Sequence, residues 1–281
     1  MVSVNKRSPW RRAARRIRQM MTRGATLVDP LVHPNPDGLL PPAHLRIYYY
    51  GSWNPALVAR AGENARVELM SRGLRPDHRV LDIGSGIGNL ALALRDDLKG
   101  GYDGLEIHPE AVAWCQQAIS TRYPSFRFHR ADVASTAYNP TGAGAASAYR
   151  FPFAEGTFDF ILLASVFTHM LPDEVAQYLR EIRRVLKPGG LCVCSFFLLN
   201  EQTRRSVEEG RSFMSFDVPH ASGVCRLHDA AVPEAAVAYE ESFVEGLHRD
   251  SHLRIREIRR GQWWSGAAHD QDVLTVEGLT L

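Results

Sequence analysis

The sequence lacks the hallmarks of a membrane-spanning or disulfide-stabilised protein. No stretch approaches the roughly 18 consecutive apolar residues that a membrane-spanning helix needs. The four cysteines are too few and too scattered for a disulfide framework, which is typical of a reducing compartment. Cys192 and Cys194 alternate within an apolar run, which favours packing inside a strand, and no CxxC pair or histidine cluster indicates a metal site. We therefore expect a cytoplasmic protein without a bound metal.

Net charge is small, but it is unevenly distributed along the chain. The total is +2, yet residues 1–23 carry eight Lys and Arg and no acid, so the remaining residues carry −6. A domain that binds nucleic acid usually carries the basic charge itself, so we expect no sequence-specific contact with nucleic acid. Between the arginines, apolar side chains recur at helical spacing at Trp10, Ala13, Ala14, Ile17 and Met20 or Met21. The tail is expected to be either a solvated arm or a peripheral contact with an anionic membrane, which would make the protein membrane-peripheral.

From residue 79 onward, apolar runs alternate with helical patterns. The runs that predict strands are Val80–Ile83, Tyr102–Ile107, Phe126–His129, Phe158–Ala164 and Leu191–Leu199. The helical patterns between them are Asn89–Leu98, Pro109–Arg122 and Asp173–Leu186. Strands that alternate with helices imply right-handed crossovers and a parallel sheet covered on both faces. The fold class predicted from the residues is therefore α/β.

Other segments flank this core of residues 79–199. Residues 1–42 are expected to be the basic tail followed by a Pro-rich linker, 29–42, and residues 43–281 the main folded domain. Within that domain, residues 43–78 form an N-terminal cap with a helical pattern at Pro55–Arg72. Residues 200–238 break the alternation and are predicted to be an insertion over the active site. Residues 239–281 predict a helix near Tyr239–Arg249 and strands at Leu253–Arg260 and Asp272–Val276.

The strongest local pattern is a glycine-rich turn after the first predicted strand. Residues 80–88 read VLDIGSGIG, so a buried strand runs into three glycines and then a helix. Glycines let the backbone approach a ligand closely at the positive end of a helix. A nicotinamide-binding G-x-G-x-x-G loop would need its third glycine at position 89, which is occupied by Asn89. Asp82 precedes the first glycine, and this acid suits an ammonium-bearing amino-acid moiety better than a pyrophosphate.

The spacing D-x-G-x-G-x-G resembles the first motif of the class I methyltransferases, whose cofactor is S-adenosylmethionine and whose product is S-adenosylhomocysteine. The resemblance continues through residues 79–199 at Glu106, at Asp132-Val133, at Phe158-Asp159-Phe160 and at Lys187-Pro188-Gly189-Gly190. It implies a Rossmann-like, seven-stranded, mostly parallel sheet with helices on both faces and a C-terminal reversed β-hairpin. Glu106 ends the second predicted strand, where an acid can accept both ribose hydroxyls. The cofactor-binding residues implied are Asp82, Gly84, Ser85, Gly86, Gly88, Glu106, Ile107, Asp132, Val133 and Ser165.

The segment from Ser165 to Met170 follows the fourth predicted strand, and it should face the transferred methyl group because ligands of open α/β sheets bind at the carboxyl ends of strands. It lacks the (N/D)-P-P-(Y/F) motif of relatives that methylate adenine amines or glutamine amides, and the Pro-Cys nucleophile of pyrimidine C5 methylation. His169 is the best-placed proton acceptor and is the predicted catalytic base. The alternative is that His169 only packs or caps the next helix.

Aromatic residues flank this site in the sequence. They are Tyr48, Tyr49, Tyr50 and Trp53 before the core, and Trp263 and Trp264 between the last predicted strands. Aromatic rings stack on sugars, flat rings or cations, although core packing is the plain alternative. The predicted acceptor-binding residues are Tyr48, Tyr50, Trp53, Thr168, His169 and Trp263.

A narrower resemblance concerns uncharacterised bacterial methyltransferases, through Pro41–Tyr48, Tyr138–Gly142 and Ser165–Met170. It implies methylation of a small molecule or saccharide. We therefore predict an S-adenosylmethionine-dependent enzyme of class EC 2.1.1 that O-methylates a small metabolite, such as a natural product, or a saccharide. Two alternatives stay open: methylation of a small-molecule amine, and a cofactor-binding protein of this fold without methyl transfer.

Overall fold

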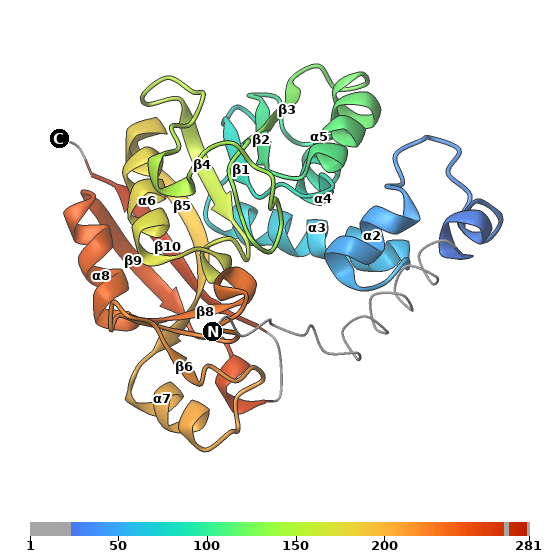
Figure 1. Ribbon diagram of the computed structural model, residues 1–281. Helices are drawn as coiled ribbons and strands as arrows, with labels where there is room; N and C mark the ends of the chain where they lie inside the picture. The colour runs from blue at the N-terminus through green and yellow to red at the C-terminus, as the bar shows by residue number, and fades with distance from the viewer. Residues whose placement is uncertain (1–23, 267–269, 280–281) are drawn as a thin grey trace.

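A mixed sheet of ten strands organises the computed structural model, which describes residues 24–266 and 270–279 (Figure 1). The strands are β1 (Val80–Ile83), β2 (Tyr102–Glu106), β3 (Phe126–Arg130), β4 (Phe158–Leu163), β5 (Leu186–Leu199), β6 (Val218–Pro219), β7 (Cys225–Leu227), β8 (Val237–Glu240), β9 (Leu253–Arg259) and β10 (Asp272–Gly278). The α-helices are α2 (Ala43–Tyr50), α3 (Pro55–Ser71), α4 (Asn89–Leu94), α5 (Pro109–Cys115), α6 (Pro172–Val185), α7 (Glu201–Glu208) and α8 (Glu241–Asp250). Residues 24–32 are also helical.

The central strands confirm the predicted Rossmann-like fold class. Strands β3, β2, β1, β4 and β5 lie side by side in that order and run parallel, and β10 and β9 continue the sheet as an antiparallel pair. These strands are the expected seven, with the reversed hairpin at the C-terminus. Strand β1 is in register with β2, so that Ile83 lies opposite Leu105. Because parallel strands end at one edge, Asp82 and Glu106 reach the same edge of the sheet.

Two apolar layers hold helices against the two faces of the sheet. Alternate strand residues face opposite sides, as the pleat requires. Leu81 of β1 packs in the layer that contains α6 and α8, whereas Val80 packs in the layer that contains α3, α4 and α5. Figure 1 shows the same arrangement, with α6 and α8 on one side of the strands and α3 to α5 on the other. Because helices cover both faces of the sheet, nearly every residue of β1, β2 and β4 is buried.

Several predicted boundaries shift in the structure. Strand β5 begins at Leu186 rather than Leu191, because the segment after α6 already pairs with β4 across a register shift. Helix α4 ends at Leu94, and the second predicted helix ends in a π-helical turn, Gln116–Ser120. Tyr239 belongs to β8, so the last helix starts only at Glu241.

The insertion at 200–238 adds secondary structure that the sequence pattern did not reveal. After α7, strands β6 and β7 form an antiparallel pair, β7 pairs with β8, and β8 runs parallel to the end of β5. One residue of this insertion, Glu234, reaches the pocket described below. In the described part of the chain, no helix is long and apolar enough to cross a membrane.

The predicted Pro-rich linker is wrong at its start, because residues 29–32 belong to the helix at 24–32. Asp29 and Pro30 are residue types that are common in turns, so the local sequence pattern did not predict this helix. A contact distant in the sequence fixes it instead, since the carboxylate of Asp29 is paired with the guanidinium of Arg46 on α2.

Candidate cofactor and acceptor site

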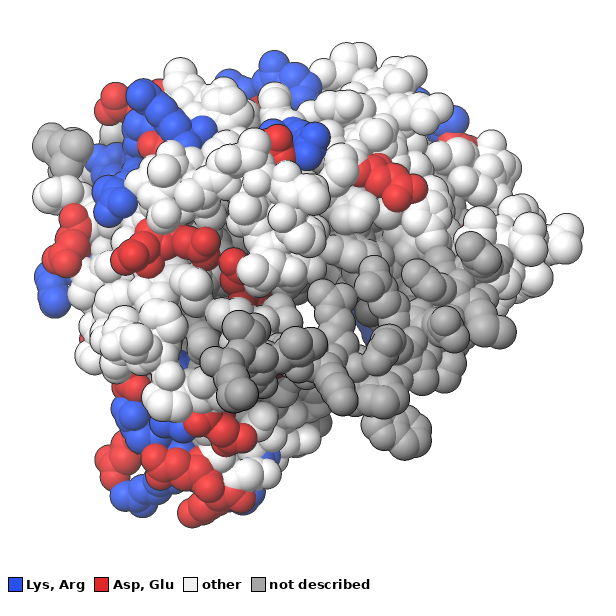
Figure 2. Space-filling view, viewed as in Figure 1, with Lys and Arg blue, Asp and Glu red and all other residues white. Residues whose placement is uncertain are grey.

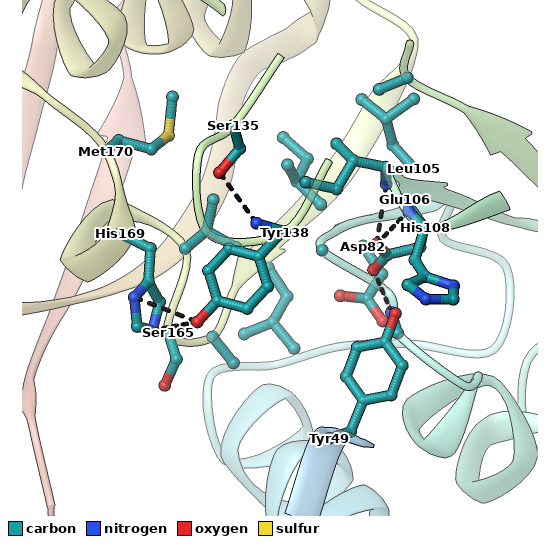
Figure 3. Close-up of a pocket in the computed structure, with 18 of the residues that line it drawn as sticks. Tyr49, Asp82, Leu105, Glu106, His108, Ser135, Tyr138, Ser165, His169 and Met170 are labelled. Atoms are coloured by element: carbon teal, nitrogen blue, oxygen red, sulfur yellow. Dashed lines mark hydrogen bonds between the residues drawn. The ribbon is translucent and has the colours of Figure 1, made fainter. Parts of the chain in front are cut away.

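A cavity of about 480 Å³ opens at the carboxyl ends of β1, β2 and β4. The loop after β3 and the helices α2 and α6 complete its walls. This is the position where open α/β sheets bind ligands. Figure 3 shows the acids Asp82 and Glu106 on one side of the cavity and the pair Tyr138 and His169 on the other.

The glycine turn between β1 and α4 forms the floor of the cavity. Gly84 and Gly88 both have positive φ, 75° and 73°, which side chains rarely adopt. A Cβ at Gly84 would lie 2.6 Å from the side chain of Val166, and one at Gly88 would lie 2.5 Å from Ile119. The backbone amide of Gly84 donates to the carbonyl of Leu105 at 2.7 Å, which ties the turn to β2. The chain can therefore make this turn only with glycine.

Asp82 is a buried carboxylate on the floor of the cavity. The hydroxyl of Tyr102 donates to it at 2.6 Å. Burial, with a contribution from the neighbouring charge of Glu106, outweighs that hydrogen bond and raises the pKa of Asp82 to about 7. Among the described residues, no cationic side chain is paired with Asp82, so a bound cation would stabilise its charged form.

Glu106 organises the backbone around the cavity. Its carboxylate accepts hydrogen bonds from the amides of Gly86, Ile107 and His108, each at 2.8 Å. Burial raises its pKa, although these three backbone donors oppose the shift. The same carboxylate links the glycine turn to the end of β2, so its loss would loosen both.

The chemistry of the cavity wall suits a cationic, ribose-bearing cofactor such as S-adenosylmethionine. Asp82, Glu106, Glu174 and Glu234 line the cavity, whereas no Lys or Arg appears among the described residues of its lining. The hydroxyl of Tyr49 is buried there beside the carboxylate of Glu106. An unneutralised acidic lining attracts an ammonium or sulfonium group, and tyrosine rings add a face for cations.

His169 ends a 3₁₀ turn, Phe167–His169, that follows β4. Its Nδ1 lies 3.1 Å from the backbone carbonyl of Glu234, and the hydroxyl of Tyr138 lies 3.2 Å from both ring nitrogens. Burial lowers the pKa of His169 below its usual value. A neutral ring that donates from Nδ1 to the carbonyl keeps the lone pair of Nε2 for a proton.

Ser165 sets the direction of this turn. It has a positive φ of 57°, which is uncommon for a residue other than glycine and marks a constrained backbone. Its amide donates to the hydroxyl of Ser195 on β5 at 2.8 Å, and its own hydroxyl donates to Gln271 Oε1 at 3.1 Å. These contacts hold the end of β4 against β5 and direct the following turn towards the cavity.

Most of the residues predicted from the sequence meet at this cavity. Those that line it are Tyr48, Tyr50, Asp82, Gly84, Gly86, Glu106, Ile107, Val133, Ser165 and His169. Ser85 and Gly88 belong to the same turn but face away from the cavity. A Cβ added at Gly88 would enter the apolar core. The hydroxyl of Ser85 is buried against β2, where a Cβ added at Gly104 would lie 2.8 Å from it.

The other predicted residues lie outside the cavity lining. Asp132 is exposed and paired with Arg130 at 2.8 Å. Thr168 is fully buried, and the ring of Trp53 packs edge-on against His33 at 5.3 Å between centroids. Trp263 is 1% exposed and packs in an apolar cluster with Phe197 and Phe216. For Trp263, the structure therefore favours core packing over acceptor binding.

Sequence reasoning missed Tyr138 and Glu234 as site residues. Tyr138 lies in a loop after β3. The side-chain amide of Asn139 closes this loop by donating to the backbone carbonyl of Val133 at 2.9 Å. Glu234 approaches from the insertion, and its carboxylate accepts from the hydroxyls of Ser135 and Thr136 at 2.9 and 2.7 Å. No local signal marked Glu234, because its partners lie about a hundred positions earlier in the chain.

The fold and the site are those expected of a class I methyltransferase, and comparisons with known proteins support this interpretation. Residues 81–194 match a family described as a methyltransferase domain. A demethylmenaquinone methyltransferase of Beutenbergia cavernae is 29% identical over 206 residues, 73% of this chain and 72% of that protein. One from Thermus thermophilus is 32% identical over 41% of this chain, and the methyltransferase GfsG of Streptomyces halstedii is 28% identical over 50%. This chain matches 45% and 48% of the lengths of those two, so it spans about half of each.

Solved structures show the same fold. The PH0226 protein of Pyrococcus horikoshii has a TM-score of 0.55 and 18% identity, with 79% of this chain and 90% of that chain covered. A Methanosarcina mazei protein described as a SAM-dependent methyltransferase has a TM-score of 0.51 and 21% identity, with 76% and 98% covered. The chain therefore has the fold of the class I methyltransferases, and its residues 81–194 match a methyltransferase-domain family.

Proposed function

We propose that this protein transfers a methyl group to an oxygen atom of a small hydroxylated acceptor, a metabolite or saccharide, with His169 as the base. The observation that carries the proposal is a partly buried imidazole, with a lowered pKa, on the acceptor side of the cavity opposite the acids Asp82 and Glu106. A hydroxyl is a weak nucleophile until its proton is removed, so a base at this place is the group that O-methylation needs.

The residues divide into two roles in this proposal. S-adenosylmethionine, when bound, supplies a methyl group on a positively charged sulfur. Asp82 holds the ammonium of the amino-acid moiety, and Glu106 accepts from the ribose hydroxyls. On the acceptor side, Nε2 of His169 takes the hydroxyl proton while the carbonyl of Glu234 fixes the ring through Nδ1. Tyr138 orients the acceptor oxygen beside Nε2.

A second candidate is methylation of a ring carbon next to a phenolic hydroxyl. Several relatives are called demethylmenaquinone methyltransferase, and one is called a ubiquinone/menaquinone biosynthesis C-methyltransferase. Removing the proton of a phenol makes the neighbouring ring carbon nucleophilic, so the same base would serve. The two candidates differ only in the atom that receives the methyl group.

The test uses S-adenosylmethionine with a labelled methyl group and a panel of acceptors: a saccharide, a polyhydroxylated aromatic, a hydroquinone and a primary amine. The labelled atom is then located by NMR. We expect label on oxygen, and a kcat in His169→Ala that is ~10²–10⁴ lower while S-adenosylhomocysteine binding is retained. The control is His228→Ala, an exposed histidine outside the cavity.

Label on ring carbon with the same loss in His169→Ala would select the second candidate. Label confined to the amine, or a loss below about fivefold, would overturn the role of His169 as base. Tight cofactor binding without label in any acceptor of the panel would count against the proposal and favour a binding protein.

A further inference from the structure

The helix at residues 24–32 exposes an apolar surface. Leu27 and Leu31 are 79% and 84% exposed, and Val28 and Val32 are 44% and 53% exposed. These four residues are half of the large apolar side chains that are exposed in the described part of the chain. Leu27 and Leu31 are four residues apart, as are Val28 and Val32, so they form one continuous stripe on the helix. We call these four residues the apolar stripe.

The helix is fixed to the body by its other face. The carboxylate of Asp29, the buried residue of this helix, pairs with Arg46, whose side chain is completely buried in α2. His33 also contacts Asp29 at 2.8 Å, and its ring packs against Trp53. The helix lies at the end of the molecule beyond α2 in Figure 1, and that projecting end is mostly uncharged in Figure 2. The apolar stripe is therefore turned outwards.

The charge around the stripe indicates what covers it. Residues 1–23, which directly precede the helix in the sequence, carry eight Lys and Arg and no acid. The helix itself has one acid, Asp29, which is buried against Arg46. Exposed leucines next to a run of basic residues match a membrane surface with negatively charged headgroups, where apolar side chains insert and cations meet phosphates. The remainder of the chain carries a net charge of −6, so this end holds the positive excess of the sequence.

We propose that the apolar stripe, together with the basic residues that precede it, docks this protein reversibly on an anionic lipid surface. The docking helix is tied through Asp29 and Arg46 to α2, and α2 also supplies Tyr48, Tyr49 and Tyr50 to the cavity. Docking would thus hold a wall of the cavity close to the membrane. The proposal does not depend on which acceptor the enzyme uses.

The test is flotation of the full-length protein with vesicles of phosphatidylcholine, with or without phosphatidylglycerol, at low salt. The variant is Leu27→Gln combined with Leu31→Gln, which removes apolar surface without changing charge. The matched control is Val67→Gln combined with Met70→Gln, two exposed apolar residues on α3 that are 53% and 40% exposed. Thermal unfolding checks that both variants fold.

We expect the wild type and the control to float with phosphatidylglycerol vesicles and not with phosphatidylcholine alone. The Leu27/Leu31 variant should bind at least about tenfold more weakly, and high salt should weaken all binding. Equal binding of the two double variants would overturn the proposal. A wild type that is dimeric by light scattering, with a monomeric Leu27/Leu31 variant, would overturn it in favour of contact between two copies of this chain.

Discussion

The backbone carbonyl of Glu234 lies 3.1 Å from Nδ1 of His169, while the carboxylate of the same residue holds the loop that carries Tyr138. One carboxylate oxygen accepts from the hydroxyls of Ser135 and Thr136 and from the backbone amide of Thr136. Glu234 therefore connects the insertion to both groups on the acceptor side. In the proposed reaction it is a positioning residue, because it would act through His169 and Tyr138.

We expect Glu234→Ala to lower kcat by ~10- to 100-fold, because the loop that carries Tyr138 loses its anchor, although the backbone carbonyl that contacts Nδ1 of His169 remains. Glu234→Gln keeps one carbonyl oxygen in place and should recover most of this loss. The measurement is kcat and KM for the acceptor, with Glu209→Ala as control, since Glu209 is exposed on the same insertion. A Gln variant as inactive as the Ala variant would show that charge, rather than position, matters.

The second prediction concerns the pH dependence of cofactor binding. The pKa of Asp82 is raised to about 7, so the residue is largely protonated below that pH and ionised above it. Only the ionised form attracts an ammonium group. Affinity for S-adenosylhomocysteine should therefore rise between about pH 5.5 and 7.5, by at most about tenfold per pH unit for a single proton.

Asp82→Asn cannot ionise, so calorimetry should find weaker and nearly pH-independent binding over the same range. Asp159, which pairs with Lys187 at 2.8 Å outside the cavity lining, provides the matched control through Asp159→Asn. A wild-type affinity that is flat from about pH 5.5 to 7.5 would mean that Asp82 is not the group facing the ammonium.

The third prediction concerns Glu106. Glu106→Ala should weaken S-adenosylhomocysteine binding by about 1–3 kcal/mol, as loss of a charged hydrogen-bond partner does. The amides of Gly86, Ile107 and His108 would also lose their acceptor, so the melting temperature should fall as well. Glu106→Gln retains an acceptor oxygen and should separate the two effects. Unchanged affinity by calorimetry in both variants would rule out the ribose assignment.

The cofactor half of the site was predictable because its signals are local. The strand Val80–Ile83 and the glycines after it are contiguous, and Glu106 ends a strand that pairs directly with β1. Apolar runs and glycine spacing therefore specified both the strand and the turn.

The acceptor half was less predictable because its contacts are distant in the sequence. His169 contacts Glu234 from 65 positions away, and of strands β6, β7 and β8 it is β8, about 40 positions after the end of β5, that pairs with β5. The helix at 24–32 likewise depends on Arg46, which is 17 positions after Asp29. No periodicity within the insertion or the Pro-rich segment encodes these contacts.

The last prediction separates core packing from acceptor binding at Trp263, which the sequence placed on the acceptor side. Its indole Nε1 donates to Asp272 at 2.9 Å, and its ring lies 5.2 Å from that of Phe197. Asp272 also accepts from the amides of Leu198 and Gly261, so the indole completes a buried carboxylate site at the start of β10.

Trp263→Phe keeps much of the apolar volume but leaves that carboxylate with one donor fewer, which should cost about 1–3 kcal/mol of unfolding free energy in urea. KM for the acceptor should change by less than about twofold, since Trp263 does not line the cavity. The matched control is Trp264→Phe, because the indole of Trp264 is only half-buried and donates to a backbone carbonyl, that of Gly261, at 3.1 Å. Its loss should cost less, as no buried charge depends on it. A raised KM with unchanged stability in Trp263→Phe would contradict the packing role and return this residue to the acceptor site.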